Sequence, residues 1–125
     1  MNSVREIACP IITAAVRRLF VEANTELEPD VKDSLQRARA SETSGLGRYV
    51  LDRILENAEI AAQDRMPLCQ DTGLAIVFAE IGQDVHVTGG DFQDAVQEGV
   101  RQAYGEGFLR KSICDPFTRI NTGDN

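Results

Sequence analysis

The sequence predicts an α+β fold in which helices dominate, and two observations lead to this prediction. Apolar residues recur at three- and four-residue steps through three stretches of the first half, which is typical of amphipathic helices. Two short runs, at about 74–81 and 85–87, then show the apolar and alternating patterns of strands. One more helical stretch and an irregular tail follow. The predicted order is therefore helix, helix, helix, strand, strand, helix and tail.

The first helix is expected at about residues 3–22. Its apolar stripe consists of Val4, Ile7, Ile11, Ala14, Ala15 and Leu19. Because proline lacks a backbone N–H, the helix either begins near Pro10, with Cys9 just before it, or is kinked there. Cys9 falls near the apolar face, and free cysteine packs as a small hydrophobe, so we expect a buried structural thiol.

Two further helices complete the first half. One opens at Pro29, with acidic neighbours that complement the helix dipole, and it should end near Ala40. Its apolar face is weak, so it is expected on the surface. Ser44 can cap the third helix, at about 46–64, by accepting a hydrogen bond from a backbone N–H. This third helix has a continuous apolar stripe, which consists of Leu46, Tyr49, Val50, Ile54, Ala58 and Ala61.

The two expected strands differ in pattern. The continuous apolar run at 74–81 predicts a buried strand, whereas 85–87 reads as a short strand after a turn. His86 lies between two valines in that short strand. This position is more typical of a surface residue than of a base or a metal ligand, and the role of His86 is left open.

The last part of the chain contains a helix and a polar tail. Asp91 can cap the fourth helix, which should end before Gly105. The tail combines Arg110, Lys111 and Arg119 with hydroxyl, amide and carboxylate side chains and has little apolar patterning. Its composition alone is typical of a solvated tail.

The turn between the third helix and the apolar run carries four chemically different side chains in a row. Cys69, Gln70, Asp71 and Thr72 present a thiol, an amide, a carboxylate and a hydroxyl within the stretch 67–73. The first residue of that stretch is a proline, which ends helices, and the last is a glycine, which permits a tight turn. Such a turn can direct several polar groups at one point, although most turns of this kind only connect elements and bond to their own backbone.

The composition limits the partners that the chain can bind. The sequence has 125 residues, 20 acidic and 13 basic, with a formal net charge of −7. A chain this acidic is a poor partner for nucleic acid or for an anionic membrane surface. A small dianionic substrate remains compatible with it, because a local cluster of arginines can outweigh distant carboxylates.

The same sequence favours a cytosolic protein. No apolar run approaches the ~20 residues that a membrane span needs, and the first residues lack the pattern of a secretion signal. The three cysteines Cys9, Cys69 and Cys114 are an odd number at wide spacing. This fits neither a disulfide framework nor a CxxC metal motif, and leaves free thiols or a shared metal site.

Two segments, 67–73 and 109–125, resemble the class I, iron–sulfur-dependent fumarate hydratases and the related L(+)-tartrate dehydratase alpha subunits. The first reads Pro-Leu-Cys-Gln-Asp-Thr-Gly; the second contains Leu-Arg-x-Ser, then Asp-Pro, then Asn-Thr-Gly-Asp-Asn. The resemblance implies that Cys69 ligates a [4Fe–4S] cluster. It also implies that Gln70 and Asp71 contact the substrate, with Asp71 in a position for proton transfer, and that Arg110 pairs with a substrate carboxylate.

The resemblance further implies a hydro-lyase that reversibly adds water to a small dicarboxylate, either fumarate/malate or tartrate, at the open iron of the cluster. A cubane cluster needs three or four thiolates, and neither Cys9 nor Cys114 matches a ligand of the family. Residues 1–125 are therefore expected to be the N-terminal portion of a longer alpha region, inactive alone. Its partners would be the rest of that region, a beta domain or subunit and, given an unfinished sheet and apolar face, a second copy in a homo-oligomer. The alternative is a non-catalytic assembly or binding module.

Overall fold

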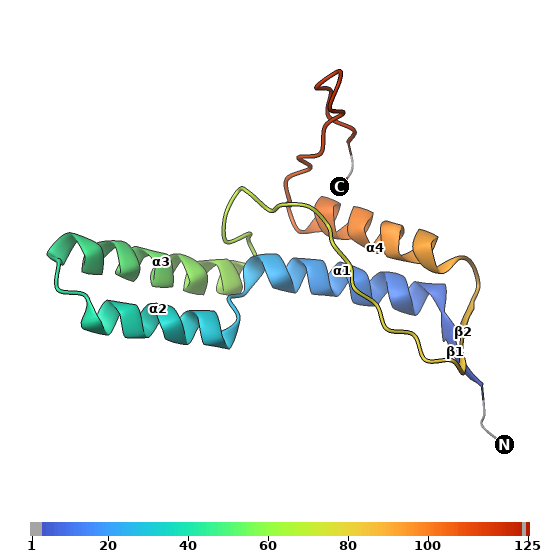
Figure 1. The fold of residues 1–125 in the computed structure, drawn as a ribbon, viewed down its shortest axis with the longest axis horizontal. Helices are drawn as coiled ribbons and strands as arrows, with labels where there is room; N and C mark the ends of the chain where they lie inside the picture. Colours follow the sequence, from blue (N-terminus) through green and yellow to red (C-terminus); the bar gives the residue numbers. More distant parts are fainter. Residues whose placement is uncertain (1–3, 124) are drawn as a thin grey trace.

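The computed structural model describes residues 4–123 and 125. Along the chain it contains β1 (Arg5–Ala8), α1 (Cys9–Thr25), α2 (Pro29–Ser41), α3 (Gly45–Asp64), β2 (Val85–Thr88) and α4 (Phe92–Glu106), followed by an irregular tail. The α+β class with helices dominant is therefore confirmed. Figure 1 shows α1 and α4 side by side, while α2 and α3 form a hairpin that extends away from them.

The first expected helix is shorter than its pattern suggested, because its first turn is replaced by a strand. Residues 5–8 pair in parallel with β2, with Arg5 opposite Val85 and Ala8 opposite Thr88. Helix α1 begins at Cys9 and places Pro10 in its first turn, where a missing N–H leaves no hydrogen bond unmade. Of the two alternatives at Pro10, the start of a helix is therefore the correct one. Ser3, the first residue of the expected helix, lies outside the described residues.

The prediction of a buried strand at 74–81 is wrong. These residues are extended, but within the described chain they belong to no sheet. Ile76 is 68% exposed and Phe78 is 95% exposed. A continuous apolar run becomes a buried strand only where neighbouring strands and a covering layer meet it, and the described residues supply neither. The segment instead runs along α1 towards β2 (Figure 1).

The other expected elements agree with the structure. Helix α2 contains no buried residue, and Ser44 caps α3 by accepting a hydrogen bond from the N–H of Gly47 at 3.3 Å. Asp91 caps α4 through the N–H groups of Gln93 and Asp94, although α4 continues one residue past Gly105. The strand at 85–87 is confirmed as part of β2, and His86 is exposed in it.

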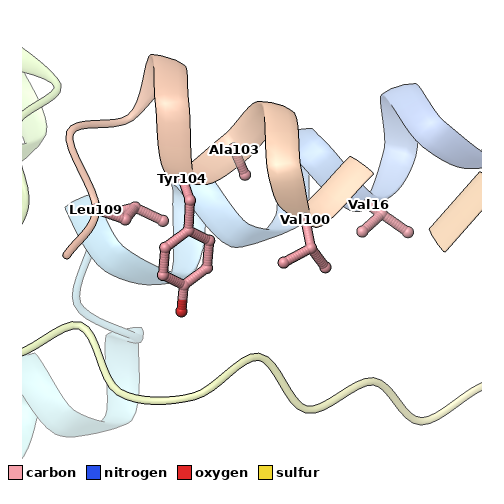
Figure 2. Close-up of a cluster of buried hydrophobic side chains, with 5 residues drawn as sticks. All are labelled: Val16, Val100, Ala103, Tyr104 and Leu109. Atoms are coloured by element: carbon pink, nitrogen blue, oxygen red, sulfur yellow. The ribbon is translucent and has the colours of Figure 1, made fainter. Parts of the chain in front are cut away.

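The core lies between α1 and α4. It consists of Val16, Val100, Ala103, Tyr104 and Leu109, whose side chains are drawn in Figure 2. The two helices approach closely at Gly99, where an added Cβ would lie 2.7 Å from the carbonyl oxygen of Thr13 and from Cβ of Val16. Glycine is thus required at this contact.

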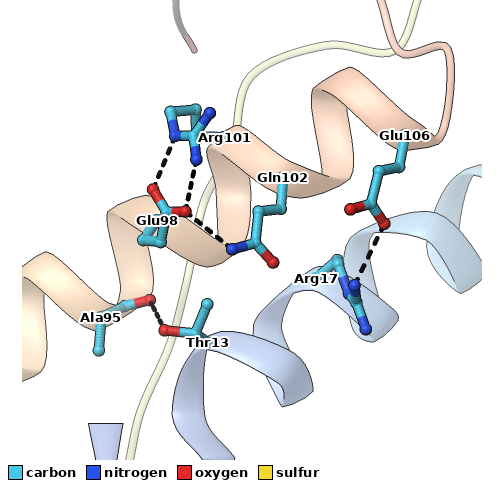
Figure 3. Close-up of polar contacts among 7 residues, drawn as sticks. All are labelled: Thr13, Arg17, Ala95, Glu98, Arg101, Gln102 and Glu106. Carbon is cyan, nitrogen blue, oxygen red and sulfur yellow. Dashed lines mark hydrogen bonds and ion pairs between the residues drawn. The ribbon is translucent and has the colours of Figure 1, made fainter. Parts of the chain in front are cut away.

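Polar contacts fasten the same two helices along their length (Figure 3). The hydroxyl of Thr13 donates to the carbonyl of Ala95 at 2.9 Å, and Arg17 pairs with Glu106 at 3.2 Å. Cys9 is half-buried, and its thiol lies 3.6 Å from the carbonyl oxygen of Asp91. The pair of α1 and α4 therefore forms a scaffold on which the turn and the tail are placed.

Candidate functional site

The turn that carries Cys69 is anchored on two helices. Helix α3 ends at Asp64, and Arg65 then adopts a left-handed conformation with φ of 53°. The N–H of Leu68 donates to the carbonyl of Asn24, near the end of α1, at 2.8 Å. The side-chain amide of Asn57 on α3 donates to the carbonyl of Leu68 at 2.9 Å. The residue before Cys69 is thereby fixed at both backbone groups.

The first three polar side chains of this turn face solvent. Cys69, Gln70 and Asp71 are all exposed. The Sγ of Cys69 accepts a hydrogen bond from the N–H of Asp71 at 3.4 Å, which folds the turn around the sulfur. A thiolate in this setting would keep one backbone donor and have an open side for a metal.

The second motif meets the first at Thr72. The N–H of Arg110 donates to Oγ1 of Thr72 at 2.9 Å, and that hydroxyl donates to the carbonyl of Arg110 at 3.2 Å. Leu109 is buried in the core at 5% exposure, whereas Arg110 is exposed. The structure therefore places Arg110 in contact with Thr72, the residue that follows Cys69, Gln70 and Asp71. Along the chain, 38 residues separate Arg110 from Thr72.

Asn125 adds a second connection between the motifs. Its side-chain amide donates to the carbonyls of Gly73 and Arg110 at 3.1 and 3.2 Å. Its Oδ1 accepts hydrogen bonds from the N–H groups of Ser112 and Ile113. Sequence reasoning assigned no role to Asn125, and the only signal was its place in the second motif. Asp124, in the same motif, lies outside the described residues.

The tail between these contacts forms its own small loop. Asp115 accepts hydrogen bonds from the backbone N–H and hydroxyl of Thr118 and from the N–H of Phe117, and these bonds hold the pKa of Asp115 below its ordinary value. Cys114 and Asn121 form an isolated antiparallel bridge. The tail is therefore ordered by local hydrogen bonds, which its composition alone did not indicate.

Cys9 does not lie with Cys69. Cys69 follows the contact with the last turn of α1, whereas Cys9 is the first residue of that helix. A helix of 17 residues is roughly 25 Å long at ~1.5 Å per residue, so Cys9 is far from Cys69. In the described part of the chain, no group of three or more His, Cys, Asp or Glu side chains is arranged to hold a metal. The described residues therefore do not fit a whole cluster on their own.

A cavity of about 730 Å³ lies next to the two motifs. It is bounded by α4, by residues near Ala75 and by the tail, and Arg101, Tyr104, Lys111 and Asn125 line it. None of the four site residues expected from the sequence is among the described residues that line this cavity. They lie outside it, on an exposed rim that consists of the Cys69–Asp71 turn and Arg110, which are joined through Thr72.

Comparison with known proteins gives the class. The model of the family "Fumarate hydratase (Fumerase)" matches residues 13–125, and the chain belongs to this family. The chain is 36% identical to the aerobic class I fumarate hydratase of Salmonella typhimurium and 36% identical to that of Escherichia coli, over 99% of its length in both cases. It is 28% identical to the L(+)-tartrate dehydratase subunit alpha of Escherichia coli, again over 99% of its length.

The matched region is only part of each relative. The chain spans 22% of the Salmonella fumarate hydratase and 41% of the Escherichia coli tartrate dehydratase alpha subunit. The family resemblance stated from the two motifs is thus confirmed.

Among the described residues, none of the helices combines the length and the apolar character that a membrane span requires.

Proposed function

We propose that this chain is the N-terminal part of the catalytic alpha region of an iron–sulfur hydro-lyase that adds water to, or removes it from, a small dicarboxylate. The observation that carries the proposal is the contact between Thr72 and Arg110, which joins the two motifs on one exposed rim. The family match and the names of the fumarate hydratase and tartrate dehydratase relatives support the reaction class. The choice between fumarate/malate and tartrate is left to the assay.

In this proposal Cys69 is one thiolate ligand of a [4Fe–4S] cluster. Such a cluster needs three or four thiolates, so the other ligands must come from outside the described residues. When bound, an iron with an open position supplies a Lewis acid for the hydroxyl group that is lost. The exposed sulfur of Cys69, with its single backbone donor, supports this role.

The neighbouring side chains have roles that follow from their chemistry. Arg110 pairs with a substrate carboxylate, because a guanidinium offers two parallel N–H donors in a fixed plane. Gln70 hydrogen-bonds the substrate. The carboxylate of Asp71 takes a proton from a substrate carbon when water is lost and returns it when water is added. All three side chains are exposed at the rim, so a substrate can reach them.

The test compares this chain alone with the protein encoded by its complete reading frame. Both are reconstituted anaerobically with iron and sulfide, and iron per protein and turnover of fumarate, malate and tartrate are measured. We expect a four-iron cluster and turnover in the complete protein and neither in the isolated chain. Cys69→Ser should remove most of the iron, whereas Cys114→Ser, which changes another exposed thiol, should not. The proposal fails if the complete protein turns over none of these acids and Cys69→Ser leaves iron content unchanged.

A second role, in assembly, is favoured by the apolar surface that the described residues leave uncovered. Leu46, Tyr49 and Ile60 on α3 are each at least half exposed, as are Ile76 and Phe78. Such surfaces mark association sites, and we propose contacts with the rest of the alpha region, with a beta domain or subunit, or with a second copy. Sedimentation of the isolated chain tests self-association. The cytosolic location remains a prediction.

A further inference from the structure

Thr72 is connected to Arg110 in an unusual way for a loop residue, because its hydroxyl bonds both backbone groups of one distant residue. A hydroxyl carries one donor and two acceptor sites, so it can accept from the N–H and donate to the carbonyl at once. Serine can do the same, whereas valine, which has nearly the same shape, can do neither. The identity of residue 72 therefore decides whether this direct link between the Cys69 turn and Arg110 can form.

Asn125 uses all of its hydrogen-bonding capacity in the same place. Its NH2 group donates to one carbonyl in each motif, those of Gly73 and Arg110, and its Oδ1 accepts from the backbone of Ser112 and Ile113. An amide has two N–H donors and an oxygen with two lone pairs, so these four bonds saturate it. An aspartate at this position would keep the acceptor side but lose both donors.

Tyr104 ties this arrangement to the core. This residue of α4 is 3% exposed, and its hydroxyl donates to the carbonyl of Gly73 at 3.2 Å. Figure 2 shows this hydroxyl pointing away from the core towards the extended segment. The carbonyl of Gly73 thus accepts from Tyr104 and Asn125, and that of Arg110 accepts from Thr72 and Asn125.

We propose that Thr72 and Asn125 are positioning residues that hold Arg110 at a fixed place relative to the Cys69–Asp71 turn, and so set the affinity for the substrate carboxylate. Both backbone groups of Arg110 are held, while its side chain remains exposed and free to bind. The inference rests on the proposed function for its ligand. The arrangement itself concerns only residues of this chain, so it can be tested without activity.

The first test measures amide hydrogen exchange by NMR in this chain. Among the described contacts, the N–H of Arg110 has Thr72 as its acceptor in an irregular segment. Thr72→Val should speed exchange at Arg110 at least tenfold, whereas Thr72→Ser should change it less than threefold. Thr43→Val, at an exposed position between α2 and α3, is the matched control and should have no effect. Exchange at Ala103, in the core, should stay constant in all variants and so excludes general unfolding.

Asn125→Asp gives a sharper result, because it keeps the hydrogen-bond acceptor of the side chain and removes its two donors. Its carboxylate can still accept from Ser112 and Ile113, so their amides should remain protected. A carboxylate oxygen would face the carbonyl oxygens of Gly73 and Arg110, and this repulsion should displace Arg110 from Thr72, so exchange at the N–H of Arg110 should rise about tenfold. Equal exchange at Arg110 in wild type, Thr72→Val and Asn125→Asp would overturn the proposed arrangement, whatever the activity of the protein.

The second test measures kinetics in the protein from the complete reading frame. An arginine that binds the same carboxylate before and during the reaction contributes uniform binding, so displacing it raises KM and leaves kcat nearly unchanged. Thr72→Val should raise KM at least tenfold with kcat within about threefold, and Thr72→Ser should restore KM. A loss of kcat at constant KM, or no rescue by serine, would overturn the positioning role. An inactive wild-type protein would instead refute the proposed function and leave the exchange result to decide the arrangement.

Discussion

The two helix pairs of this chain are built in opposite ways. Helices α1 and α4 enclose the buried cluster around Val100 and Tyr104, with a glycine at their closest approach. Helices α2 and α3 are joined by a short loop, yet α2 contains no buried residue and only Ala58 and Ala61 are buried on α3. The contrast shows that an apolar stripe predicts a helix but not the surface that covers it.

The largest expected difference between the pairs comes from tyrosine truncation. Tyr104→Ala should lower the free energy of unfolding by about 3–5 kcal/mol, as for other large aromatic truncations in cores. Tyr49→Ala, which removes the same side chain at 60% exposure on α3, should change it by no more than about 0.5 kcal/mol. Urea denaturation of both variants measures the difference. Equal losses would mean that the hairpin is packed as tightly as the core.

Glycine substitutions sharpen the same comparison. Gly99→Ala places a methyl group 2.7 Å from the Thr13 carbonyl oxygen, so it should cost about 1–3 kcal/mol by forcing α1 and α4 apart. Gly105→Ala, also in α4, meets nothing within 4 Å and should stabilise the chain by about 0.5–1 kcal/mol through helix propensity. Denaturation midpoints of the two variants should therefore move in opposite directions, and a shared direction would contradict the close contact.

Acid should lower the free energy of unfolding through Glu98 on α4. Hydrogen bonds from Arg101 and Gln102 lower the pKa of Glu98 from 4.5 to about 2 (Figure 3). The folded pKa lies below the unfolded one, so this contribution is complete above about pH 4.5 and is lost as the pH falls towards 2. Between pH 5 and pH 3, Glu98→Gln should lose less stability than wild type. Parallel pH profiles of the two proteins would argue against the bonded carboxylate, and an NMR titration of Glu98 provides the direct value.

The smallest expected effects are those of the surface ion pairs. Arg39 on α2 bonds Asp52 on α3 at 2.7 Å, which lowers the pKa of Asp52, and Arg17 on α1 pairs with Glu106 on α4 at 3.2 Å. Exposed pairs of this kind contribute little and are screened by salt. Arg39→Gln and Arg17→Gln should each shift the melting temperature slightly at low salt and not at high salt. A large shift in only one of the two variants would mean that ion pairing, rather than apolar burial, distinguishes the α1–α4 pair from the α2–α3 pair.

Local sequence signals predicted the helices and their caps well. They did not predict contacts between residues far apart along the chain. The caps Ser44 and Asp91 were recognisable because a cap acts within three residues of itself. The pairing of residues 5–8 with β2 was not, since its partner lies most of the chain away and four residues carry little pattern. The run at 74–81 was read as a buried strand because it is apolar, but burial depends on neighbours that the run itself does not encode.

The candidate site divides in the same manner. Cys69, Gln70, Asp71 and Arg110 came from the wording of two motifs, and their assigned roles remain proposals. The contact that joins the motifs through Thr72 could not be predicted, because a single hydroxyl gives no sign of a partner 38 residues away. Long-range hydrogen bonds become visible only once the chain is folded.

The pairing of α1 with α4 also governs the order in which the molecule can form. The hydroxyl of Thr13 reaches a carbonyl 82 residues further along, and closing a loop of that length costs on the order of 4 kcal/mol of chain entropy. The hairpin of α2 and α3 needs no such closure and can form within microseconds of its synthesis. Helix α1 leaves the ribosome early but must wait for α4 before its apolar face is covered. Until then, the uncovered apolar surface makes the unfinished chain prone to aggregation.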